Sequence, residues 1–170
     1  MEVKRYTLLA AVALAVGLLT GCAAVDPRGI AEERLSDSVA TSVAAMAEVV
    51  ATASDDAALV ATDYTTVASS QLLSGLTEQP EGGATDTLYC LDRVDGEITA
   101  CVFYPMDVDI PSGLDGFYAS VYGCAELSGI PGSRDITVKD SECPQELVDW
   151  FSERSSVEVP DAVSIAAFVD

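Results

Sequence analysis

The sequence predicts an α+β fold in which an alanine-rich helical segment packs on a small antiparallel sheet that disulfides hold together and a C-terminal helix follows. Three observations predict it. Residues 30–74 contain neither Gly nor Pro and place apolar residues at helical spacing, β-prone runs begin after residue 86, and most of the cysteines lie in that second part. Helical and strand segments that occupy separate parts of a chain are typical of α+β proteins. The length of 170 residues suits one domain.

The composition excludes several classes of function. The chain has no His, which removes Ser-His-Asp triads, Cys-His pairs and His-ligated metals from the candidate chemistries. Its net charge is −20 and its pI is near 4.1. Nucleic acid is excluded as a partner, because proteins bind phosphates through Lys and Arg.

The first 21 residues have the organisation of an export signal. Lys4 and Arg5 form a basic start, and an apolar run from Leu8 to Leu19 follows. This run is shorter than the roughly 20 residues that a membrane-spanning helix needs. Cys22 follows directly, in the sequence Leu19-Thr20-Gly21-Cys22.

This arrangement resembles the lipobox of bacterial lipoproteins. The resemblance implies that the Cys22 thiol carries a diacylglyceryl group, that a signal peptidase cuts after Gly21, and that lipid holds the chain to the membrane from outside the cytoplasm. Residues 22–29 would then be a tether. An uncleaved membrane helix, or an ordinary secretory signal cut near Ala23 or Ala24, is the alternative.

Residues 30–79 form the predicted helical segment. Ser54-Asp55-Asp56 could cap a second helix, which leaves two antiparallel helices, Ile30–Ala53 and Asp55–Leu73, or one long bent helix. The apolar stripe could also be a coiled-coil seam for a partner. Because Arg34 is the only basic residue between residues 30 and 91, the charge pairs of such a seam are missing and packing on the chain's own sheet is expected. The stripe comprises Val39, Val43, Met46, Val50, Ala53, Ala57, Val60, Tyr64 and Val67.

A β-hairpin is predicted at the start of the second part, residues 86–170. The runs Thr87–Asp92 and Glu97–Tyr104 flank Asp95-Gly96, a pair typical of a two-residue type I′ turn. In that register Cys90 lies opposite Cys101 at a distance suited to a disulfide. One face would carry Leu88, Cys90, Cys101 and Phe103, and the other Tyr89, Leu91, Ile98, Ala100 and Val102.

The first pair leaves Cys124 to bond Cys143. The sequence contains no Cys-x-x-Cys motif, so structural bridges are expected rather than a redox or zinc site. Among the later segments, Phe117–Cys124 is ambiguous between strand and helix. The others are predicted as a short strand at Asp135–Lys139, a helix from Ser141 through Trp150 and Phe151, and a closing strand at Val163–Val169.

The candidate chemical sites are weak. Asp107, Asp109 and Asp115 could offer oxygens to calcium, but Pro111 and Ser112 break any EF-hand pattern, so the three acids are interpreted as solvated loop residues. No cofactor is predicted. We expect a lipid-anchored, non-enzymatic module that binds a protein or another component of the cell envelope. The alternative is an envelope hydrolase that uses carboxylates or a bound calcium ion.

Overall fold

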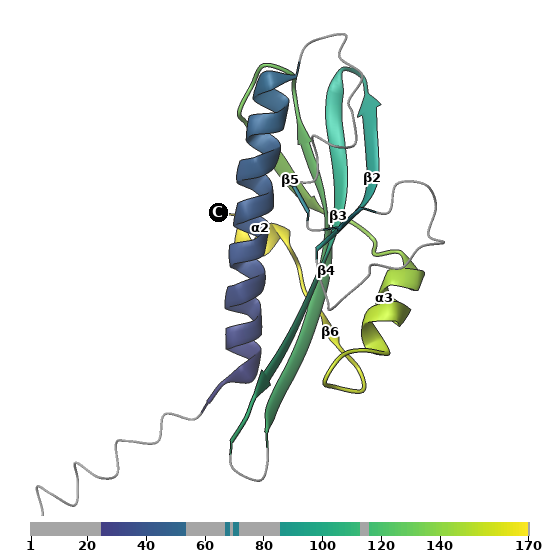
Figure 1. Cartoon of the computed structure of the whole chain (residues 1–170). Helices are drawn as coiled ribbons and strands as arrows, with labels where there is room; N and C mark the ends of the chain where they lie inside the picture. The colour runs from purple at the N-terminus through teal and green to yellow at the C-terminus, as the bar shows by residue number, and fades with distance from the viewer. Residues whose placement is uncertain (1–24, 54–66, 69, 72–85, 113–115, 170) are drawn as a thin grey trace, which may run out of the picture.

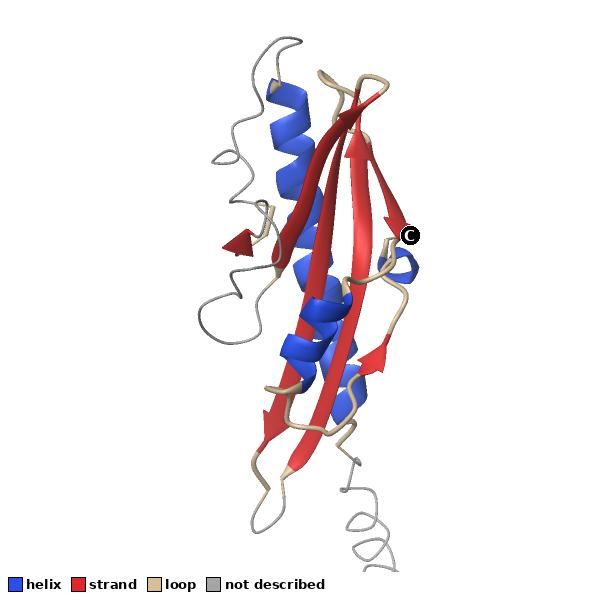
Figure 2. Cartoon of the chain, turned by 90° about the vertical axis from the view of Figure 1, so that its right-hand side faces the viewer, coloured by secondary structure: helices blue, strands red, loops and turns tan. Residues whose placement is uncertain are grey.

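The structure is a computed structural model that describes residues 25–53, 67–68, 70–71, 86–112 and 116–169. A long helix, α2 (Pro27–Thr52), lies along one face of a twisted sheet, and a short helix, α3 (Gln145–Ser152), lies on the other (Figure 1). Figure 2 shows the sheet between the two helices. The fold is therefore α+β, and it contains two disulfides.

The sheet has the strand order β1-β2-β3-β4-β5, and β6 pairs with β4. The β1–β2 and β4–β6 pairs are parallel and the others antiparallel. Strands β3 and β4 are 14 and 13 residues long and pair over nearly their full length, so they form a ribbon that the other strands flank. The strands are β1 (Ser70–Gln71), β2 (Thr87–Val94), β3 (Glu97–Ile110), β4 (Phe117–Gly129), β5 (Ile136–Asp140) and β6 (Asp161–Ala162).

Helix α2 begins earlier than the sequence suggested. Asp26 caps it by accepting a hydrogen bond from the Gly29 amide at 3.0 Å, and Pro27 opens the first turn. The predicted tether, residues 22–29, is therefore wrong for residues 27–29, which belong to α2. Since α2 ends at Thr52, with the next residue extended, one long helix is also wrong. The second helix falls mostly outside the described residues, but strand β1 occupies part of its C-terminal end.

The buried face of α2 packs on the sheet, which confirms the expected use of the apolar stripe. Its buried positions follow helical spacing, and they contact the α2-facing side chains of β3 and β4. Val67, which the sequence placed on a helix, is also buried but lies in a turn. The rest of the stripe between residues 54 and 66 lies outside the described residues. The buried residues of α2 are Ala31, Leu35, Val39, Ser42, Met46 and Val50.

The predicted hairpin register is confirmed from Val94↔Glu97 to Cys90↔Cys101. Asp95 and Gly96 have φ values of 52° and 88°, as a type I′ turn requires. The register shifts between Leu88 and Cys90. This bulge reverses two of the predicted faces, because Leu88 packs on the α2 side and Tyr89 on the α3 side.

A second apolar cluster fills the face of the sheet opposite α2. Phe103 and Phe151 meet edge to face, with ring centroids 6.2 Å apart, beside buried Trp150. The Cys124–Cys143 disulfide, with its Cα atoms 5.3 Å apart, ties β4 to the segment that leads into α3. The Cα atoms of the Cys90–Cys101 disulfide are 4.8 Å apart. Both predicted pairings are present.

Other parts of the prediction need correction. Strand β3 continues past Tyr104 to Ile110, and the ambiguous segment from Phe117 is strand β4. The closing strand predicted at residues 163–169 is absent. In its place, residues 166–168 form a 3-10 turn after buried Ile165, which covers Gly123 of β4 on the α2 face. A Cβ atom at Gly123 would lie 2.7 Å from the Val163 carbonyl oxygen as well as 2.5 Å from Ile165 Cδ1, so this close backbone approach requires glycine.

Candidate functional site

The candidate site is the end of the domain at which α2 begins, because Cys22 lies close to it in the sequence. Cys22 itself is outside the described residues. Four residues separate it from Pro27, the first residue of α2. Even fully extended, this connection spans only about 17 Å. A lipid on Cys22 would therefore hold the start of α2 near the membrane.

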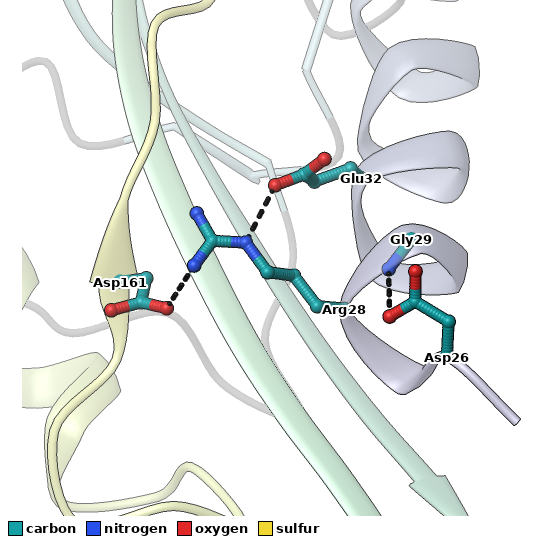
Figure 3. Close-up of polar contacts among 5 residues, drawn as sticks. All are labelled: Asp26, Arg28, Gly29, Glu32 and Asp161. Atoms are coloured by element: carbon teal, nitrogen blue, oxygen red, sulfur yellow. Dashed lines mark hydrogen bonds and ion pairs between the residues drawn. The ribbon is translucent and has the colours of Figure 1, made fainter. Parts of the chain in front are cut away.

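Arg28 joins the start of α2 to the C-terminal part of the chain. Its guanidinium donates to Glu32 at 2.9 Å and to Asp161 of β6 at 2.8 Å (Figure 3). Both carboxylates raise the pKa of Arg28, and the hydrogen bond that Arg28 donates to Glu32 has the largest effect. The pairs are exposed to water, so they position the helix start beside β6 more than they stabilise the fold.

Apolar side chains are exposed at this same end. Phe117 and Tyr118, at the start of β4, are 41% and 48% exposed, and Val159 is 78% exposed. A hollow of about 210 Å³ lies between Pro27, Tyr118 and Val159. The sequence analysis did not identify these side chains as functional. The available signal was a pair of adjacent aromatic residues directly after Gly116.

Two of the three weak calcium candidates, which the sequence analysis interpreted as solvated loop residues, lie within the described residues. Asp107 and Asp109 lie on strand β3 rather than in a loop, and Asp115 is outside the described residues. The Asp107 carboxylate accepts hydrogen bonds from the Ser120 hydroxyl and from the backbone and hydroxyl of Ser156, the latter two at 2.9 and 2.6 Å. It therefore ties the β3–β4 ribbon to the segment after α3. Within the described part of the chain, no cluster of three or more acidic or cysteine side chains could hold a metal ion.

Two further hollows lie on the α3 side of the sheet. One, of about 370 Å³, has the Cys90–Cys101 disulfide and the carboxylates of Asp92, Glu97 and Glu126 in its lining. Asp92 and Glu97 are exposed to water. The general acid of a glycosidase usually lies in an apolar pocket, and the exposed side chains of Asp92 and Glu97 do not.

The other hollow, of about 420 Å³, lies beside the Cys124–Cys143 disulfide and includes Asp140. The Asp140 carboxylate accepts from the Ser164 hydroxyl at 2.6 Å and from the Ala166 amide at 2.9 Å. The hydrogen bond from Ser164 contributes most to lowering the pKa of Asp140. Asp140 therefore fastens the C-terminal segment to the end of β5.

A carboxyl group whose pKa is raised by burial lies elsewhere, between α2 and the sheet. Asp86 accepts a hydrogen bond from the Ser38 hydroxyl of α2. Desolvation raises the pKa of Asp86 above its ordinary value, although the hydrogen bond from Ser38 opposes the shift. Nearby Ser42 donates to the Val67 carbonyl at 2.6 Å. This polar cluster connects α2 to the chain around residues 67 and 86.

We expect Asp86→Asn to change how stability depends on pH. In wild type the folded pKa is raised, so the folded chain holds a proton that the unfolded chain releases above pH 3.8. Stability is therefore lost as pH rises from 3.8 through the raised pKa. The variant lacks this loss and gains relative stability between pH 4 and pH 7, measured by urea unfolding. Asp37→Asn, at an exposed position of α2, controls for removing one negative charge. An Asp86→Asn effect that does not vary with pH would contradict the expectation.

No known protein family, no curated protein and no solved structure matches this chain. Within the described ranges, neither helix has the length and apolar character needed to cross a membrane.

Proposed function

We propose that the chain is a lipid-anchored lipoprotein of the cell envelope, held at the extracytoplasmic face of the membrane through an acylated Cys22. Its role is that of a non-enzymatic binding or accessory module. The observation that carries the proposal is the sequence Leu19-Thr20-Gly21-Cys22 after a short apolar run with a basic start. Two or more acyl chains suffice for stable anchoring, because each buried methylene contributes about 0.8 kcal/mol.

One feature of the fold supports export, and another supports anchoring through Cys22. The cysteines that follow Cys22 form two disulfides, which persist in oxidising compartments outside the cytoplasm. The helix begins close to Cys22, with Asp26 as its cap, so a lipid on that residue would attach to an ordered domain through a short connection.

Two features support a binding or accessory role. Asp107 and Asp140 accept hydrogen bonds that hold the C-terminal segment, so these carboxylates stabilise the fold. The apolar face of α2 is buried on the sheet, which leaves other surfaces for an envelope partner. Cross-linking in intact membranes, followed by purification, would identify a stoichiometric partner. Recovery of the chain alone would argue against an accessory subunit.

Cys22→Ser is expected to release the protein from the membrane, because serine has no thiol to accept the diacylglyceryl group. The measurement is the distribution of the protein between the membrane pellet and the soluble fraction after cell lysis. Mass analysis of the N-terminal peptide tests for the acyl mass in wild type. Ala24→Ser is the matched control and should stay in the membrane. A wild-type N-terminal peptide that lacks the acyl mass would contradict lipid anchoring.

A further inference from the structure

We infer that the end of the β3–β4 ribbon contacts the lipid surface beside the anchor through Phe117 and Tyr118, so that the domain stands on the membrane in one orientation. This inference rests on the proposed lipid anchor and adds a second contact to it. The occupant of this apolar surface is the interfacial region of the bilayer.

The side chains at the ribbon end suit an interface. Phe117 and Tyr118 are consecutive in β4, so they project from opposite faces of the ribbon. Both are more than 40% exposed. The Tyr118 ring lies over Gly116, where a Cβ atom would be 2.4 Å from the phenolic oxygen. Tyrosine is typical of membrane interfaces because its ring is apolar and its hydroxyl is polar.

The position of the ribbon brings these side chains toward the anchor. Figure 1 shows the ends of β3 and β4 extending beyond the first turn of α2. Tyr118 and Pro27 line the same hollow, and Arg28 holds the start of α2 beside Asp161 of β6. The start of the helix and the ribbon end therefore face the same side of the domain. A lipid on Cys22, about 17 Å of chain away at most, brings this side to the bilayer.

The charge of the chain favours an apolar contact over an electrostatic one. The net charge is −20, and Asp109, the pairing partner of Tyr118, is exposed. Anionic lipid would repel such a surface. Apolar side chains are exposed at this end, and their burial in lipid is favourable whatever the lipid charge. They are Phe117, Tyr118 and Val159. Contact is therefore expected on zwitterionic vesicles, and raising the fraction of anionic lipid at low salt should weaken it.

The test uses the full acylated protein in phosphatidylcholine vesicles. Phe117→Trp and Tyr118→Trp each place a fluorophore at the ribbon end, and brominated phosphatidylcholine quenches tryptophan within the bilayer. Ile130→Trp is the matched control, since Ile130 is 60% exposed but follows the opposite end of β4. The thirteen residues of β4 separate the two positions by roughly 40 Å. Wild type, whose Trp150 is 1% exposed, gives the background.

Both ribbon-end variants are expected to lose emission on brominated vesicles, while Ile130→Trp stays at the background level. Two independent variants keep the test valid if one misfolds. Vesicle flotation in the same samples reports anchoring separately. Protein that floats with vesicles but shows no more quenching at 117 and 118 than at 130 would overturn the ribbon contact and leave the anchor intact. Acylated protein that fails to float would overturn both.

Discussion

Trp150→Ala is expected to lower the free energy of unfolding by about 3–5 kcal/mol, the range for removing a large aromatic side chain from a core. Trp150 is 1% exposed and lies with Phe103 and Phe151 in the cluster between α3 and the sheet. The Arg154 guanidinium lies 5.2 Å from the centre of its ring. α3 is only eight residues long, so it depends on this packing to stay on the sheet.

Trp150→Phe is the matched control for that variant. The Trp150 Nε1 atom is buried and has no hydrogen-bond partner within the described part of the chain. Phenylalanine removes this unsatisfied donor while it keeps most of the apolar volume, so its cost should be well below that of alanine. Urea unfolding followed by far-UV circular dichroism measures both, because neither variant retains tryptophan fluorescence. Equal losses for alanine and phenylalanine would contradict this account of the packing.

Removing the Cys124–Cys143 disulfide with the double variant Cys124→Ser/Cys143→Ser is expected to cost about 3 kcal/mol through the entropy of the unfolded chain. The two residues are 19 apart in the sequence. The bond links the middle of β4 to the segment before α3, so its loss also frees α3 to leave the sheet. The loss is measured by urea unfolding under non-reducing conditions, in parallel with a variant that lacks the other disulfide.

Cys90→Ser/Cys101→Ser is the comparison for that variant. These cysteines are 11 apart and face each other across a hairpin that backbone pairing already holds. The entropic cost is about 0.5 kcal/mol smaller for the shorter loop, and α3 keeps its link to the sheet. A larger loss from the hairpin pair than from Cys124 and Cys143 would contradict this ranking. Because Cys124 and Trp150 share one cluster, their effects should not be additive.

Local chemistry made the hairpin predictable. Asp95-Gly96 adopts the positive φ angles that a type I′ turn needs, and this turn sets the register that brings Cys90 opposite Cys101. The spacing of apolar residues likewise identified part of the buried face of α2, including Met46 and Val50. In each case the signal lies within a few residues of the feature that it predicts.

Features that depend on distant contacts were missed. The bulge at Tyr89 reverses the predicted faces of Leu88 and Tyr89, and no turn residue marks it. Strand β3 continues through Pro105 because the described strands pair with β3 there only through β4, and such an edge position tolerates proline. The apolar residues at 163–169 suggested a strand. This segment is not a strand, and its Ile165 packs over Gly123 of β4 on the α2 face of the sheet.

One part of the candidate site could be predicted from contiguous sequence, and the other part could not. Cys22 could be proposed as the acylation site because the residues of the proposed export signal are contiguous in the sequence. The pair between Arg28 and Asp161 joins residues 133 positions apart, and the exposed pair at the start of β4 gains meaning only from its place beside α2. Neither arrangement can be recognised from the spacing of neighbouring residues in the sequence.

The packing of α2 on β3 and β4 joins parts of the chain that are far apart in the sequence. Leu35 and Met46 are buried against strands that lie some 50 to 90 residues further along the chain. Under the proposed export from the N-terminus, α2 would emerge before the strands that cover its apolar face, and close in sequence to an acylated Cys22. Contacts of such long range are typical of slow folding.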